Sequence, residues 1–328
     1  MNKRLQSPVL SRVALAAFVT AVALGCGNEL EDQVVSGDAS ATSVSEAPPS
    51  VAEIGNATIE GIYDAPVVLE DGTYEGEPFV EGGAARPRVE LLDFYRAGDM
   101  DGSGVEETVA FLSESSGGSG TVLFLAIMGR HEGEIENLGT ALVGDRVQVR
   151  DAQVEMGTVV LELLQAGPDD AMCCPGELVT RSWRFDGGNL IEIEADAPTR
   201  RLSVAELEGV QWTLRRFGWS DPYGGEPPIT IVFDSDRVAG SSGCNRYFVT
   251  IAKGDVPGGI SVGQAGGTMM TCPDEVMKVE RRYLGALAAV SGYGFMLGDL
   301  VLSYGMADGE FAAMFFEAGP IPAAGGQE

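Results

Sequence analysis

The chain has 328 residues and is strongly acidic: 49 aspartate and glutamate residues outnumber 21 lysine and arginine residues, which leaves a formal net charge of −28 at pH 7. Such a surface repels nucleic acid and anionic lipid head groups, so the charge excludes nucleic acid as a partner. Divalent cations and basic partners remain compatible with it. The length allows two ordinary domains.

Residues 1–25 have the form of a secretory signal, in which basic residues precede an apolar run from Val13 to Leu24. A run of about a dozen apolar residues is too short to span a bilayer as a stable helix. The sequence Ala-Leu-Gly directly before Cys26 resembles the lipobox of bacterial lipoproteins. This resemblance implies a lipid anchor on Cys26, and Gly27 implies the outer membrane, with the protein facing the periplasm. The alternative is an ordinary secreted protein.

Residues 26–56 are predicted to form a disordered tether. From residue 27 onward the segment contains many acidic residues, no lysine or arginine, and a Pro-Pro pair. A segment of this composition cannot bury enough apolar surface to offset the entropy lost on ordering. Residues 319–328 are predicted to be a disordered tail. Because no later apolar run reaches about 18 residues, the lipid is the only membrane attachment that the sequence predicts.

Residues 57–196 are predicted to form a first β-rich domain. Short runs of β-branched and aromatic residues alternate here with glycine-rich and acidic turns, which is typical of an antiparallel sheet or sandwich. The typical runs are Val89–Tyr95, Thr108–Leu112, Thr121–Met128, Arg146–Val149 and Thr158–Leu164. The segment from Asp196 to Arg201 is predicted to be a junction.

Residues 203–318 are predicted to form a second domain of strands with one helix. The predicted strands are Leu207–Leu214, Pro228–Phe233, Leu297–Tyr304 and Phe311–Phe316. Pro273 is predicted at the first position of the helix, with acidic residues in the first turn where the helix dipole favours them. Apolar residues at helical spacing are predicted to face the sheet; these are Val276, Val279, Tyr283, Leu287 and Val290. The fold class is therefore mainly β with one α-helix.

Five blocks in this second segment recur in the order found in the META domain, also described as HslJ-like. They are Leu-x-Gly-x-x-Trp-x-Leu at 207–214, Gly-Cys-Asn-Arg-Tyr at 243–247, Thr-Met-Met-x-Cys at 268–272, Glu280, and Leu-x-Leu at 300–302. The resemblance implies an antiparallel β fold with a packed helix, and motif residues at Asn245, Arg246, Tyr247, Thr268 and Glu280. The family includes bacterial envelope lipoproteins, some linked to heat shock or antibiotic tolerance, and it has no established enzymatic activity.

Four cysteines remain beside Cys26, and an even number in an exported chain favours disulfides. Cys244 and Cys272 lie in the same domain and are expected to pair. Asn245 and Arg246, next to Cys244, are expected to bond backbone carbonyls and a buried carboxylate such as Glu280, although they could instead line a surface site.

Cys173 and Cys174 are adjacent in the first domain. Adjacent cysteines close an eight-membered ring only through a strained peptide, and strained disulfides are easily reduced. The prediction is a vicinal disulfide or two unreactive thiols in a turn. A redox or copper role is the alternative.

An acidic loop follows the spacing of a calcium site. Side-chain oxygens stand at positions 1, 3, 5 and 9, a backbone carbonyl is available at position 7, and Gly104 at position 6 permits a sharp turn. The predicted ligands are Asp99, Asp101, Ser103, Val105 and Glu107. Ala110 stands at position 12 where an EF-hand has glutamate, so the loop is more similar to the calcium loops of FG-GAP propeller repeats. The alternative is a turn held by Asp99 alone.

The sequence does not predict an enzyme. His131 is the only histidine, and the nucleophile-elbow, phosphate-loop and HExxH patterns are missing from the sequence. We expect a binding or envelope-support role, under stress conditions, with an unknown envelope protein or ligand as partner. The loop of residues 218–225 carries Trp219 and Tyr223 and is predicted to pack on itself, with a partner surface as the alternative. The alternative function is a carboxylate-dependent enzyme acting on an envelope polymer.

Overall fold

The computed structural model describes residues 47–118, 120–171, 173–194, 197–306 and 308–321. The described residues between 47 and 321 belong to one compact unit. The predicted fold class is confirmed, because strands dominate the described chain and α2 (Asp274–Ala288) is its one long helix. The predicted signal, Cys26 and most of the predicted tether lie outside the described residues. None of the described helices combines the length and apolar character needed to cross a membrane.

The tether prediction extends too far toward the C-terminus. A short helix, α1 (Val51–Ile54), begins at a capping box in which Ser50 and Glu53 each bond the other's backbone N–H. Ile54 is fully buried, and the Thr108 hydroxyl donates a hydrogen bond to the Pro49 carbonyl oxygen at 2.6 Å. The sequence prediction missed this capping box because the segment as a whole is acidic. The predicted tail begins one residue early, since Gly319 ends the last strand.

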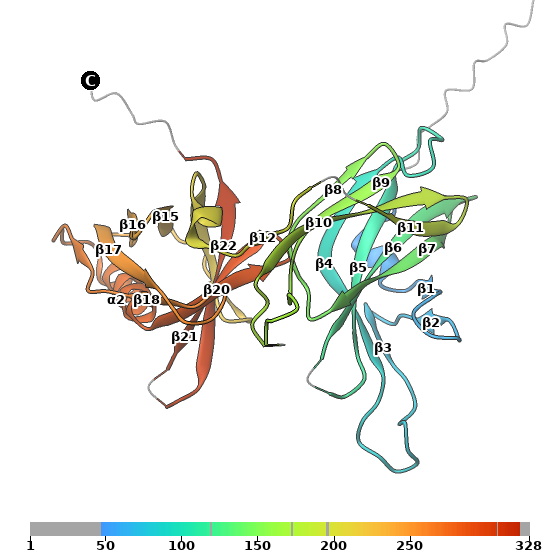
Figure 1. Ribbon diagram of the computed structural model, residues 1–328, viewed down its shortest axis with the longest axis horizontal. Helices are drawn as coiled ribbons and strands as arrows, with labels where there is room; N and C mark the ends of the chain where they lie inside the picture. The colour runs from blue at the N-terminus through green and yellow to red at the C-terminus, as the bar shows by residue number, and fades with distance from the viewer. Residues whose placement is uncertain (1–46, 119, 172, 195–196, 307, 322–328) are drawn as a thin grey trace, which may run out of the picture. The chain divides into compact units, whose positions relative to one another are not determined.

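Two five-stranded antiparallel sheets make up the first β-rich region (Figure 1). The first has the order β3-β4-β5-β6-β7, from β3 (Thr73–Glu75), β4 (Arg88–Gly98), β5 (Glu107–Ser115), β6 (Val122–His131) and β7 (Glu134–Asp145). The second has the order β11-β10-β9-β8 with β12 beside β10, from β8 (Gln148–Glu155), β9 (Thr158–Gln165), β10 (Glu177–Asp186), β11 (Asn189–Ile193) and β12 (Arg200–Arg201). Because β4 also lies beside β8 and β7 beside β11, the two sheets enclose a common core.

Strand β5 is buried on both faces, which explains its continuous apolar run. On one side lies the core between the sheets, which includes Phe94, Phe111, Leu125, Leu161 and Trp183. On the other side a second cluster is covered by α1 and the small sheet of β1 (Thr58–Ile59) and β2 (Val67–Val68). The predicted strand Arg146–Val149 begins too early, since Arg146 has a left-handed φ of 53° in the turn before β8.

The second region is a ten-stranded antiparallel sheet that curls until its ends meet. Its main path has the order β18-β17-β16-β15-β13-β22-β21-β20. The strands are β13 (Gln211–Phe217), β14 (Asp221–Pro222), β15 (Thr230–Asp234), β16 (Arg237–Ser241), β17 (Arg246–Lys253), β18 (Ile260–Val262), β19 (Gly266–Gly267), β20 (Val290–Met296), β21 (Asp299–Gly305) and β22 (Phe311–Gly319), preceded by the 3-10 helix η1 (Val204–Leu207).

The two ends of this sheet are joined beside β18 and β20. Gly259 and Gly292 form a β-bridge, and the Tyr293 N–H donates to the Gly258 carbonyl oxygen at 2.7 Å. A Cβ atom on Gly258 would lie 2.4 Å from the Tyr293 carbonyl oxygen, and its φ of 70° is left-handed, so this close approach requires glycine. The join makes the sheet barrel-like.

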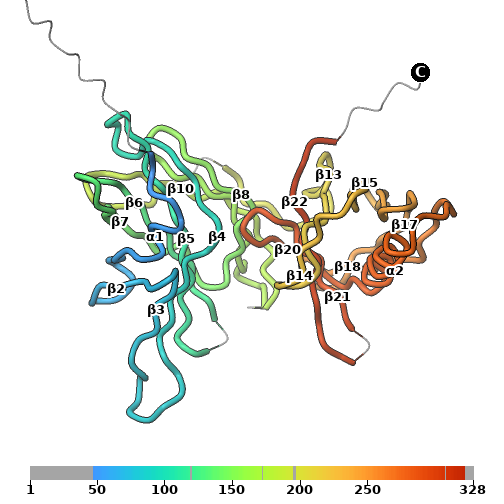
Figure 2. The backbone as a smooth tube through the Cα atoms, turned by 180° about the vertical axis from the view of Figure 1, so that it is seen from behind, coloured from blue at the N-terminus to red at the C-terminus, as the bar shows by residue number. Residues whose placement is uncertain are grey.

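Helix α2 contributes Tyr283 and Leu287 to the core of this sheet, as predicted, and it lies beside β17 (Figure 2). Two details of the prediction are wrong. Pro273 is the residue before the helix, and Val290 begins β20 instead of extending the apolar face of α2. Leu297 is in the turn between β20 and β21. The sequence did not show β20 because two glycines interrupt it, and glycine weakens strand patterns.

The described end of the segment predicted to be a junction, β12, pairs with β10, and the two β-rich regions also contact each other directly. The Phe295 N–H donates to Gln148 Oε1 at 2.7 Å, which ties β20 to β8. Arg150 donates to Glu206 Oε2 at 3.0 Å and lies over the Phe295 ring, with 5.2 Å from its Cζ atom to the ring centre. Leu164, from β9, belongs to the core cluster of the second sheet. The described residues on the two sides of the junction are therefore joined by apolar and polar contacts.

Candidate functional site

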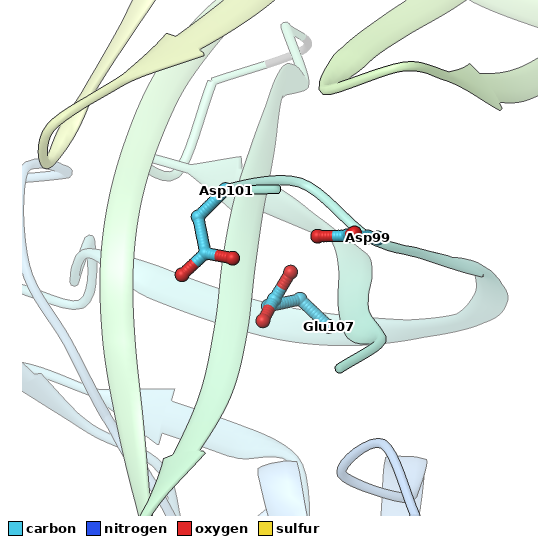
Figure 3. A group of neighbouring side chains, drawn as sticks. All are labelled: Asp99, Asp101 and Glu107. Atoms are coloured by element: carbon cyan, nitrogen blue, oxygen red, sulfur yellow. The ribbon is translucent and has the colours of Figure 1, made fainter. Parts of the chain in front are cut away.

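The acidic loop connects β4 to β5, and the hairpin brings its two ends together. Asp99 follows β4 directly, and Glu107 is the first residue of β5. Carboxylate oxygens of Asp99, Asp101 and Glu107 all lie within 4.8 Å of one another, and Figure 3 shows these side chains turned toward a common space. Three of the five predicted ligands therefore come together.

Hydrogen bonds from the backbone hold the loop in place. Asp99 accepts bonds from the N–H groups of Gly102, at 2.7 Å, and Gly104, at 3.0 Å. Asp101 Oδ1 accepts from the Ser103 N–H at 2.8 Å. The alternative to a calcium site was a turn held by Asp99 alone, whereas in the structure Asp99 and Asp101 both hold the turn. Because each carboxylate oxygen has two lone pairs, the turn leaves capacity for a cation.

Glu107 is the residue in the loop with the most unusual environment. It is 5% exposed, and its Oε2 accepts a hydrogen bond from the Met100 N–H at 2.7 Å. Burial raises the pKa of the Glu107 carboxyl, the Met100 bond opposes this, and the charges of Asp101 and Asp99 raise it further. Negative charge is therefore disfavoured at this carboxyl, and a bound cation would relieve that cost.

The other two predicted ligands are not in the carboxylate group. The Ser103 hydroxyl oxygen accepts a bond from the Val105 N–H at 3.2 Å and so contacts the loop itself. A cavity of about 600 Å³ beside the loop is lined by Asp99, Asp101 and Arg184, among others. The sequence pattern gave no sign of Arg184, because it comes from β10, far along the chain.

A second polar cluster lies between β17 and α2. Asn245 Oδ1 accepts bonds from the Thr268 hydroxyl at 2.8 Å and from the Met270 N–H at 2.7 Å, while its Nδ2 donates to Glu280 Oε2 at 3.1 Å. Glu280 is buried and also accepts bonds from the Asn245 N–H and the Ser242 hydroxyl. We call Ser242, Asn245, Thr268 and Glu280 the polar cluster.

A disulfide adjoins the polar cluster. Cys244 and Cys272 are bonded, as expected, with an S–S distance of 2.04 Å, and Cys244 is 6% exposed. The bond ties the loop before β17 to the segment before α2. Arg246 differs from its prediction: its side chain is exposed, and only its backbone takes part. The Arg246 N–H donates to the Thr268 hydroxyl oxygen at 3.2 Å, and its carbonyl oxygen accepts from the Thr268 N–H at 3.0 Å.

Tyr247 is the buried aromatic member of the motif. Its hydroxyl donates to the Thr230 carbonyl oxygen at 3.1 Å and lies 2.5 Å from the Tyr283 hydroxyl on α2. Burial, then the charge of Tyr283 and its hydrogen bond, raise the pKa of Tyr247 well above the usual range. Tyr247 is therefore a neutral hydrogen-bonding core residue at ordinary pH.

The predicted vicinal disulfide is not formed. Cys173 and Cys174 are free thiols, the first exposed and the second half-buried, in the loop between β9 and β10. The Cys174 N–H donates to the Ala171 carbonyl oxygen at 2.8 Å, so the chain takes a regular turn here. An eight-membered disulfide ring would require a strained peptide.

A buried carboxylate holds the loop that carries these thiols. Asp170, with a side chain 4% exposed, accepts bonds from the N–H groups of Gly167 and Gly176 at 2.8 and 2.9 Å, and two from Arg201 at 2.7 and 2.9 Å. The Arg201 bonds, followed by the Gly167 bond, lower the pKa of Asp170 to about 2. Both ends of the loop therefore depend on one charged group.

Asp170→Asn should lower the free energy of unfolding at pH 7 by about 1–3 kcal/mol, because charge-assisted hydrogen bonds are lost inside the loop. The stabilisation by a depressed carboxyl pKa is present above the unfolded pKa of about 4 and is lost as the pH falls through about 2. The difference between wild type and variant in urea titrations should therefore shrink between these pH values. A difference independent of pH would contradict this account.

The loop of residues 218–225 packs its two aromatic side chains on neighbouring rings, as predicted, although Trp219 stays largely exposed. Trp219 is 69% exposed, and its ring packs against Phe315 at a centroid distance of 5.1 Å, with Arg216 nearby. Tyr223 packs edge-on against Phe217. His131 is exposed and is the last residue of β6.

Comparison with known proteins supports the motif assignment. Residues 205–317 match the model of the META domain family. The C-terminal region is a META domain. An NMR structure of a protein from Burkholderia xenovorans is similar at 26% identity, covering 39% of this chain and 94% of that chain, with a TM-score of 0.28. No curated protein matches the chain.

Most motif residues of the META domain form hydrogen bonds within the domain itself. Asn245, Thr268 and Glu280 bond one another inside the polar cluster, and Tyr247 bonds the core of the sheet. The structure places none of these four in the acidic loop. The acidic loop and the META motif are therefore separate features, one in each β-rich region.

Proposed function

We propose that the protein is a lipid-anchored protein of the bacterial cell envelope, attached through Cys26 to the outer membrane and facing the periplasm, and that it acts by binding rather than by catalysis. The observation that carries the proposal is the Cys244–Cys272 disulfide inside the META domain, since disulfides persist in oxidising compartments. The structural use of Asn245 and Glu280 supports a binding or support role, because these buried side chains bond one another.

The proposal is tested by labelling cells with a clickable palmitate analogue. The full-length chain should carry the label and enter the detergent phase, whereas Cys26→Ser should remain unlabelled and enter the aqueous phase. Density-gradient separation of the membranes then distinguishes the outer from the inner membrane. Label on the Cys26→Ser variant, or an unlabelled wild type, would contradict a lipid anchor at this residue.

We further propose that the acidic loop is a calcium site, with Asp99, Asp101 and Glu107 as the carboxylate ligands and Ser103 and Val105 as candidates for the remaining positions. Support comes from the three carboxylates within 4.8 Å of one another and from the unfavourable charge on buried Glu107. Calcium takes six to eight oxygen ligands, so water would complete the coordination.

Calcium should raise the melting temperature of the protein. If the dissociation constant is about 10⁻⁴ M, as in extracellular modules, 10 mM calcium adds about 2.7 kcal/mol to the free energy of unfolding relative to excess chelator. For a chain of this size we expect a rise of several degrees in differential scanning calorimetry. Asp101→Asn should remove most of this response, because it removes one of the three carboxylate charges. Since Asp101 is exposed, the substitution should leave the fold intact.

Glu107→Gln separates ligand loss from general destabilisation. Because the pKa of the Glu107 carboxyl is raised in the folded state, this group contributes to stability at low pH. That contribution is lost as the pH rises through the folded-state pKa. Without calcium at pH 7, Glu107→Gln should therefore be at least as stable as wild type, while its calcium response disappears. Magnesium serves as the control ion. A calcium response that persists in both variants would exclude this loop as the site.

A further inference from the structure

The two free thiols open onto a cavity that the proposed function does not use. The cavity has a volume of about 330 Å³, and its lining includes Cys173, Cys174, Gln148, Tyr293 and Met296. The thiols come from the loop between β9 and β10, whereas Met296 ends β20 in the META domain. Three sulfur-containing residues from two parts of the described chain therefore line one cavity.

The position of the thiols is fixed by the surrounding structure. Asp170 closes the loop through Gly167, Gly176 and Arg201, as described above, and Cys174 is half-buried. Contact with the Cys173 thiol, followed by burial, raises the pKa of Cys174. Both thiols are thus held close together in the reduced form, in a loop that is closed at both ends.

The chemistry of the lining favours a soft cation over a hard one. Among the described residues that line the cavity there is no aspartate, glutamate or histidine, so it lacks the carboxylates that favour calcium and the four ligands of a closed zinc site. Thiolates and thioethers select soft ions such as Cu(I). The strongly negative chain also attracts cations in general.

We propose that Cys173, Cys174 and Met296 bind a soft monovalent cation of the Cu(I) type. The thioether of Met296 binds without a change in protonation. Each thiol that binds as a thiolate releases its proton to solvent, the metal keeps its oxidation state, and no electron is transferred. The site is independent of the lipid anchor and of the acidic loop.

Silver(I) is a suitable probe, because it is soft, monovalent and stable in air. Native mass spectrometry of the full chain, after thiol counting has shown Cys173 and Cys174 to be reduced, should give one bound silver ion that survives competition by a weak thioether ligand. Cys173→Ser and Cys174→Ser should each lower the affinity by an order of magnitude or more. Met296→Leu should lower it by a smaller factor at unchanged melting temperature.

Met156→Leu is the matched control, since Met156 is 98% exposed and does not line the cavity; it should bind silver as wild type does. Zinc and calcium should not compete for the silver site. The proposal is overturned if the reduced wild type binds no silver, if binding survives in the Cys173→Ser/Cys174→Ser double variant, or if Met156→Leu weakens binding as much as Met296→Leu. It is also overturned if the two thiols prove to be bonded to each other in the purified protein.

Discussion

Replacing both Cys244 and Cys272 by alanine should lower the free energy of unfolding of the META domain by about 3.5 kcal/mol. The two residues are 28 positions apart, and by the loop-entropy estimate a bridge of that span restricts the unfolded chain by this amount. Alanine is preferred to serine because Cys244 is buried, and a hydroxyl there would need a hydrogen-bond partner. Urea titrations of both proteins measure the difference.

The free thiols provide the control for this experiment. Cys173→Ala/Cys174→Ala removes two sulfur atoms without removing a cross-link, and both residues lie at least partly at the surface. Its stability should stay within about 0.5 kcal/mol of wild type. Adding reductant should weaken wild type and this control variant equally and leave the Cys244→Ala/Cys272→Ala variant unchanged. A reductant effect on that variant would show that another bond carries the stabilisation.

Asn245→Asp should be about as damaging as loss of the disulfide, although the side chain keeps its shape. The change replaces the Nδ2 group that donates to Glu280 Oε2 with an oxygen, and the new carboxylate faces a buried carboxylate. Broken hydrogen bonds and an uncompensated buried charge together cost about 3–5 kcal/mol. Thermal unfolding at pH 7 should show a large fall in melting temperature with the disulfide intact.

The pH dependence identifies charge as the cause. Protonating the introduced carboxylate removes the repulsion, so the stability gap between Asn245→Asp and wild type should narrow as the solution is made acidic. Asn245→Ala introduces no charge, and its gap should not narrow in this way. Arg246→Gln is the control for the motif, since the Arg246 side chain is exposed and should be replaceable at little cost. A harmless Asn245→Asp would mean that the polar cluster does not stabilise the domain.

Local patterns predicted much of the fold. The alternating runs at β4, β5, β6 and β9 and the amphipathic face of α2 are short-range signals, and the structure contains these elements. Two local predictions were wrong for different reasons. Val290 continued the apolar spacing of α2 but begins β20, and the Ser50–Glu53 capping box was concealed by the acidic segment around it.

The candidate sites were predictable only where their residues are close in sequence. Asp99, Asp101 and Glu107 belong to one hairpin, so their spacing alone brought them together. Met296 could not be associated with Cys173 and Cys174 from the sequence, because they are joined only through the packing of β20 against the first region. Arg201, the partner of Asp170, is 31 residues from it and was missed for the same reason.

In the closed sheet of the META domain, an early strand pairs with the last strand to be synthesised. Strand β13 pairs with β15 and also with β22, and Arg215 on β13 bonds Glu317, which is 102 residues further along. Contacts of such long range form slowly, and a chain made from its N-terminus holds β13 and β21 as open edges until the nine residues of β22 have emerged. The domain therefore completes its fold only after its last strand exists, and until then these two edges are the surfaces at which other chains could add.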